Sequence, residues 1–127
     1  MSKIETYTID KNGKKPTIRF VFGQADWGTY ASVLYDSSGK NRIKISEGVN
    51  TDDIDDVAPV GLPASLENTF LVWRALPNGT SDNEDNKYYV EVIIEQEGSR
   101  DPRVIQYSGE YQSHGTLLQG SIKFIYA

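Results

Sequence analysis

Residues 69–76 read TFLVWRAL and residues 88–97 read YYVEVIIEQE. Side chains alternate between the two faces of a β-strand. In the second run, four apolar side chains therefore share one face: Tyr88, Val90, Val92 and Ile94. Glutamates alternate with them, as is typical of a half-buried antiparallel strand with one wet face. The first run is apolar on both faces, which indicates a central strand. The polar segment 77–87 joins the two runs, and its Pro-Asn-Gly opening predicts a long β-hairpin.

Further strand-like runs recur along the chain at short spacing. They cover residues 4–10, 17–23, 29–36, 42–47, 104–110 and 117–126. The turns at 11–14 and 37–40 contain glycine and predict hairpins between the first and second runs and between the third and fourth. The sequence therefore predicts a single all-β domain over residues 1–127. Its expected architecture is an antiparallel β-sandwich of about eight strands, of jelly-roll or Greek-key type.

Residues 48–67 interrupt this regular spacing of strand-like runs. They contain four aspartates between 52 and 56, followed by Pro59 and Pro63. A loop of this length is uncommon in a compact domain. We expect it to cross from one sheet to the other, as Greek-key chains do. Residues 63–67 are expected to form one helical turn with proline at its first position.

The composition limits the class of protein. A chain of 127 residues with 38% hydrophobic content has room for one core. No apolar run approaches the roughly 20 residues that a membrane-spanning helix needs. The N-terminus lacks an apolar signal core, which predicts a soluble cytoplasmic protein unless it is exported by another route or a signal has been removed. The absence of cysteine excludes disulfides and thiolate chemistry.

The net charge is −5, but the charges are unevenly distributed. The first 44 residues carry +4 and the remainder −9. Nucleic-acid binding depends on clustered lysine and arginine, so this net acidic chain is predicted not to bind nucleic acid. We expect the basic and acidic parts to lie beside each other and to neutralise locally.

The sequence offers little catalytic machinery. The chain has one histidine, His114, in a predicted loop, and no strand–turn–helix elbow surrounds a serine. Phosphate loops, dinucleotide fingerprints and metal-hydrolase motifs are absent. Carboxylate pairs are available among the 18 acidic residues, but no pair stands out. The protein is therefore predicted not to be an enzyme.

An acidic loop is one candidate binding feature. Residues 82–86 are DNEDN, and residues 52–56 hold four further carboxylates. Calcium takes 6–8 oxygen ligands, which makes Asp82, Glu84 and Asp85 candidate calcium ligands. The alternative is a solvated loop, since the EF-hand spacing is absent. Residues 82–89 resemble the calcium loop of small bacterial calcium-dependent lectins, and no residue role is carried over from a resemblance of this length.

Aromatic residues are the second feature, with eight tyrosines and two tryptophans. Trp27 beside Gly28, followed by Tyr30, forms a candidate platform for a sugar ring, as does Tyr111 near His114. The alternative is that such rings fill the core, which we expect of Trp73.

Together these features predict a non-catalytic, lectin-like module that binds a glycan or small polar ligand with calcium as a candidate cofactor. The alternative is a structural or assembly protein. It would form a homo-oligomer through an edge strand or an apolar sheet face such as that of Leu71 and Trp73.

Overall fold

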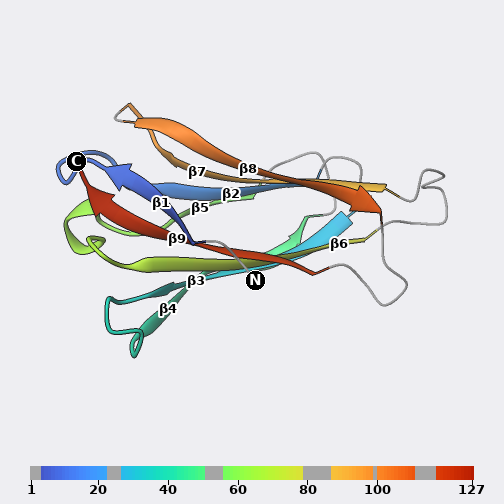
Figure 1. Cartoon of the computed structure of the whole chain (residues 1–127), viewed down its shortest axis with the longest axis horizontal. Coiled ribbons are helices and arrows are strands. Elements are labelled where there is room, and N and C mark those ends of the chain that lie inside the picture. The colour runs from blue at the N-terminus through green and yellow to red at the C-terminus, as the bar shows by residue number, and fades with distance from the viewer. Residues whose placement is uncertain (1–3, 23–26, 51–55, 79–86, 99, 111–116) are drawn as a thin grey trace.

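The structure, a computed structural model, describes residues 4–22, 27–50, 56–78, 87–98, 100–110 and 117–127 (Figure 1). These ranges hold nine strands and one short 3-10 helix. The five-stranded sheet has, in spatial order, β1 (Ile4–Ile9), β9 (Leu118–Tyr126), β6 (Phe70–Asn78), β3 (Trp27–Tyr35) and β4 (Arg42–Asn50). The four-stranded sheet has β5 (Asp56–Pro59), β2 (Thr17–Phe22), β7 (Lys87–Gln96) and β8 (Arg100–Glu110). The sheets lie one over the other, which confirms the predicted all-β sandwich.

Neighbouring strands are antiparallel except for β1 and β9, which run parallel with Ile4 opposite Ser121. The predicted hairpin between β3 and β4 is present, and β7 and β8 form another. Gly39 and Gly98 lie in the two turns with φ of 75° and 78°. A residue with a side chain is strained in this region of backbone conformation, so glycine is favoured at both positions.

The hairpin predicted between residues 69–76 and 88–97 is wrong. These runs form β6 and β7, which belong to different sheets. The predicted pairing of β1 with β2 is wrong for the same reason. An apolar inward face is satisfied equally by a partner beside it and by a sheet packed against it. Alternation along the chain therefore identifies a strand without identifying its neighbours.

The expectation that residues 48–67 lead from one sheet to the other is wrong, because β4 and β6 both belong to the five-stranded sheet. The connection instead reaches the four-stranded sheet, where it forms β5, and then returns. This short strand pairs with β2, with Val57 opposite Arg19, and it raises the strand number to nine. The 3-10 helix η1 (Pro63–Ser65) begins with proline and confirms the helical turn expected there. No helix in the described ranges has the length and apolarity needed to cross a membrane.

The core lies between the sheets and is built from the inward faces of alternating strands. Its largest fully buried apolar side chains are Trp73, Phe20, Phe124, Ile9, Ile18, Leu66, Leu71, Ile94 and Ile122. Trp73 is 2% exposed, which confirms that it fills the core. The face of Leu71 and Trp73, expected as a surface for oligomerisation, is therefore interior. It is buried because β6 is central in its sheet and the four-stranded sheet covers its inner side.

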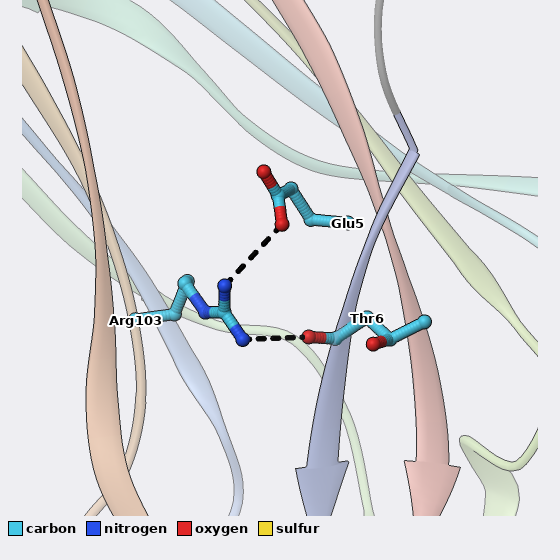
Figure 2. A network of polar contacts seen from close by, with 3 residues as sticks. All are labelled: Glu5, Thr6 and Arg103. Atoms are coloured by element: carbon cyan, nitrogen blue, oxygen red, sulfur yellow. Dashed lines mark hydrogen bonds and ion pairs between the residues drawn. The ribbon is translucent and has the colours of Figure 1, made fainter.

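Polar contacts join the two sheets along one side of the sandwich. Figure 2 shows Arg103 of β8 reaching β1, where one guanidinium nitrogen lies 3.3 Å from a Glu5 carboxylate oxygen and another donates to the Thr6 carbonyl at 3.3 Å. The Tyr7 hydroxyl donates to the Asp101 carbonyl at 3.0 Å and accepts from the backbone N–H of Gln96 at 3.1 Å. These bonds hold the edge strand β1 against the four-stranded sheet.

Candidate functional site

Most of the residues predicted from the sequence to form a binding site lie outside the described residues. These are Asp82, Glu84, Asp85, Tyr111 and His114. Trp27 is the first residue of β3, and its side chain is also outside the description. Strand β3 begins where β6 ends, and β7 begins where β8 ends, at the same end of the sandwich (right in Figure 1). The strand ends that flank residues 79–86 and 111–116 therefore lie at one end of the molecule.

Tyr30 is the one predicted site residue whose side chain is described. It points inward from β3 and is 8% exposed. Its ring stacks on Phe20 of the opposite sheet, with centroids 4.8 Å apart and planes inclined by 21°. Tyr30 thus packs in the core, and it also borders one of the hollows described next.

Two adjoining hollows lie on the outer face of the five-stranded sheet, and together we call them the sheet groove. The first has a volume of about 350 Å³, with an apolar floor of Ala31, Val33 and Val72 beside the Tyr35 ring. The second, of about 370 Å³, is lined by residues of β3, β4 and β6: Thr29, Tyr30, Ala31, Glu47, Gly48, Val49, Arg74 and Leu76. Ala31, Glu47 and Arg74 line both hollows, which makes the groove continuous.

Strand pairing explains which side chains border the groove. On β3, Tyr35, Val33 and Ala31 point outward, and each has one partner on β4 and one on β6. Those partners are Arg42 and Phe70, Lys44 and Val72, and Glu47 and Arg74, respectively. The groove therefore has three cross-strand rows, with Tyr35, Val33 and Ala31 in the middle and charged residues toward β4 and at one position of β6.

An irregularity in β4 brings Lys44 and Glu47 to the same face. These residues are three positions apart, so strict alternation would place them on opposite faces. The register shifts between Ser32 and Val33, so that Ser46 lies opposite Ser32 while Lys44 lies opposite Val33. Such a bulge re-aims side chains locally. Strict alternation would place Ser46 on the same face as Lys44, but Ser46 points inward instead, and its hydroxyl bonds to that of the buried Ser32.

Positive charge dominates this face. Among the described residues, no carboxylate lies within 4.0 Å of the Arg42 or Arg74 guanidinium. Lys44 pairs with Glu47 at 3.8 Å, but both side chains are largely exposed, and such pairs contribute little. Lys123 of β9 lies over the Phe70 ring, 5.7 Å from its centroid. Two arginines are thus free to bind an anion from solution.

The outer face of the four-stranded sheet has the opposite character. Its described charged residues are Arg19, Glu91, Glu95 and Glu110. Ion pairs such as Arg103–Glu5 and Lys14–Glu97 join the basic and acidic parts of the chain at the rim. Away from the rim, by contrast, positive charge predominates on the outer face of the five-stranded sheet, and negative charge predominates among the described residues on the outer face of the four-stranded sheet.

The described residues offer the groove one carboxylate, Glu47, and no histidine. Within the described ranges, no three histidine, aspartate or glutamate residues gather in a way that could hold a metal ion. The arrangement is suited to binding a ligand with an apolar face and an anionic group.

Comparison of this chain with protein-family models, with curated proteins and with solved structures finds no match. Tyr35, Arg42, Lys44 and Arg74 were not predicted from the sequence as site residues. Two signals point toward them: the +4 charge of the first 44 residues, and the apolar outer face of residues 69–76. Neither signal shows that β4 and β6 flank the same strand.

Proposed function

We propose that the protein is a non-catalytic binding module that holds carbohydrate in the sheet groove. The observation that carries this proposal is the apolar floor of Ala31, Val33 and Val72, placed between the Tyr35 ring and the Arg74 guanidinium. A sugar ring has apolar C–H faces and a rim of hydroxyls, so it complements a floor of this kind bordered by fixed polar groups. The volume of each hollow lies within the roughly 300–1,000 Å³ that small-molecule sites occupy.

The backbone beneath the groove supports this proposal. Its floor is formed by β3 and β6, which are paired continuously from Trp27–Asn78 to Tyr35–Phe70. Side chains on paired central strands are held more precisely than side chains on loops. Binding in the groove therefore requires little ordering of the backbone, which would otherwise oppose association.

The experiment is a glycan array followed by calorimetry on the strongest binders. Ala31→Tyr places a ring on the part of the floor that both hollows share, where a ligand would lie, and is expected to weaken binding at least about tenfold. Tyr89→Ala, on the outer face of the other sheet, is the matched control and is expected to leave binding unchanged. An array without binders, or full binding by the Ala31→Tyr variant, would contradict the proposal.

Calcium assistance through Asp82, Glu84 and Asp85 remains a prediction from the sequence, because these residues lie outside the described part of the chain. A ligand that binds the native state raises the melting temperature by mass action. We expect millimolar calcium to raise the melting temperature and EDTA to reverse the rise. The rise should be absent when Asp82→Asn and Asp85→Ala are combined, and an unchanged melt of the native protein would remove calcium from the proposal.

A second candidate function is self-association. One cross-strand row on the outer face of the four-stranded sheet consists of Val57, Arg19, Ile93 and Val104, and its two terminal valines are 55% and 42% exposed. Exposed apolar patches with a polar rim often mark protein interfaces. Light scattering at increasing concentration tests this function, with Val104→Lys expected to dissociate any oligomer. A monomer at high concentration would exclude association through this row.

A further inference from the structure

We infer that the groove selects an acidic glycan, whose carboxylate or sulfate binds Arg74 at the point where the two hollows meet. This inference rests on the proposed carbohydrate function and narrows it to one class of ligand.

Arg74 has the position that an anion receptor needs. It points outward from the central strand β6 and lies directly opposite Ala31, the smallest side chain of the groove floor. It lines both hollows, and within the described ranges no carboxylate neutralises it. A guanidinium offers a planar fork of donors that matches a carboxylate or sulfate in two-pronged geometry.

Glu47 makes the site selective among anions. It lies opposite Ala31 from the other side, so that Arg74 and Glu47 flank the same floor residue. A carboxylate accepts hydrogen bonds from sugar hydroxyls and repels a second negative charge. A ligand that carries both an anionic group and hydroxyls satisfies the two residues together.

The length of the groove favours an oligosaccharide. Successive rows along β3 are two residues apart, or about 7 Å, so the rows of Arg74 and Arg42 are separated by about 13 Å. Arg42 offers a second cationic position at the far end of the first hollow, and Lys44 lies in the row between Arg42 and Arg74. A linear glycan with repeated acidic residues can reach both positions at once, which a monosaccharide cannot.

The observations favour a glycan over a nucleic acid. A single strand of nucleic acid is usually bound on successive aromatic rings along a basic channel. The first hollow has one ring among its outward-facing side chains, Tyr35, and its floor is aliphatic.

The test is titration of the full chain with four ligands: an oligogalacturonate, a heparin-derived oligosaccharide, neutral cellohexaose and a single-stranded oligonucleotide. The first two separate a carboxylate source of the anion from a sulfate source. We expect one or both to bind more tightly than cellohexaose and to weaken as salt rises, as ion pairing requires. Arg74→Gln is expected to weaken that binding about tenfold or more, because it removes a charge-assisted pair. Arg19→Gln, an arginine replaced on the opposite face, is the matched control and is expected to have no effect.

Glu47→Gln gives a second readout. It is expected to narrow the difference in affinity between the acidic glycans and the oligonucleotide, because the repelling charge is removed and the amide oxygen that remains is a weaker acceptor for sugar hydroxyls than a carboxylate. Cellohexaose binding as tightly as the acidic glycans, or acidic binding unaffected by Arg74→Gln, would overturn the inference and leave the carbohydrate function standing. Failure of all three glycans overturns both proposals, as does an oligonucleotide that binds more tightly than any glycan.

Discussion

Among the described strands, glycine faces an aromatic ring in three cross-strand pairs: Trp73 with Gly120, Tyr30 with Gly48, and Tyr88 with Gly109. A Cβ added to Gly120 would lie 2.6 Å from Cζ2 of Trp73, closer than two carbon atoms tolerate. The ring therefore covers the bare backbone of the neighbouring strand. Pairs of this kind let a large side chain fill the space that glycine leaves open.

Gly120→Ala is expected to destabilise the fold by about 1–3 kcal/mol, the usual cost of overpacking a buried site. The added methyl group meets a ring that is 2% exposed and has no free space to enter. Chemical unfolding measures the effect, and Ser121→Ala, the outward-facing neighbour, is the control. In a Trp73→Phe background the cost should shrink, because the smaller ring removes the clashing atom. An equal cost in both backgrounds would contradict this explanation.

Gln96 is the other residue on which local structure depends. It is fully buried, and its side chain holds the turn between β1 and β2. Its amide nitrogen donates to the carbonyls of Asp10 and Lys14 at 2.9 and 2.8 Å, and its amide oxygen accepts from the Asp10 N–H at 2.8 Å. Every polar atom of the side chain thus has a partner, which is the condition for burying an amide.

Gln96→Leu removes these three bonds at nearly constant volume and is expected to cost about 2–3 kcal/mol. Urea unfolding should show a lower midpoint with an unchanged slope. Gln106→Leu is the control, because Gln106 is exposed on β8, and its effect is expected to stay within about 0.5 kcal/mol. If the two variants were equally stable, the turn would not depend on the buried amide.

At the scale of elements, the β3–β4 hairpin carries a carboxylate with a perturbed pKa. The Asp36 side chain accepts hydrogen bonds from the Ser38 hydroxyl at 2.7 Å and from the Asn41 amide at 2.6 Å. These bonds lower the pKa of Asp36 from 3.8 to about 2, and the bond from Ser38 has the largest effect. The charged form therefore stabilises the turn that precedes Arg42 and Lys44.

Because the pKa is lower in the folded state, this stabilisation is present above pH 3.8 and is lost as the pH falls toward about 2. The difference in melting temperature between the native protein and Asp36→Ala should be constant above about pH 5 and should shrink below about pH 4. Melting curves across this range measure it. Ser38→Ala should raise the pKa of Asp36 toward its usual range in an NMR titration. A stability difference that persists unchanged at about pH 2 would show that the charge of Asp36 is not involved.

At the scale of the whole molecule, most connections cross from one sheet to the other. Among the described strands, β3–β4 and β7–β8 are the pairs that are consecutive in sequence and adjacent in a sheet. The first and last strands, β1 and β9, lie side by side. Contacts in this fold therefore join segments that are far apart in sequence.

Loop-closure entropy must be overcome before such contacts form, so we expect folding in milliseconds to seconds. Stopped-flow fluorescence of Trp73, buried at the centre of the core, reports on this step. Trp27→Phe makes Trp73 the single tryptophan of the chain. Complete refolding within microseconds would contradict the dependence on long-range pairing.

The fold was predictable from the sequence at the level of strands and their buried faces. Val90, Val92 and Ile94 are fully buried, as their alternation predicts, and Trp73 fills the core. Burial of one strand face is a local property, because neighbouring residues on a strand point to opposite sides. Ile93 shows the limit, since it belongs to the outer face of β7 and is nevertheless 7% exposed. Its cross-strand neighbours cover it, and alternation does not reveal them.

The amino-acid sequence alone predicts the class of fold, the position of most strands and the apolar faces that form the core. Only the tertiary structure decided that β6 and β7 belong to different sheets and that Arg74 faces Glu47 across Ala31. The sheet groove depends on the position of β6 in the five-stranded sheet and on the placement of Arg74 and Glu47 on either side of Ala31. It also depends on the bulge that brings Lys44 and Glu47 to one face. The physical reason is that alternation along a chain records which side chains avoid water, whereas pairing depends on contacts between residues far apart in sequence.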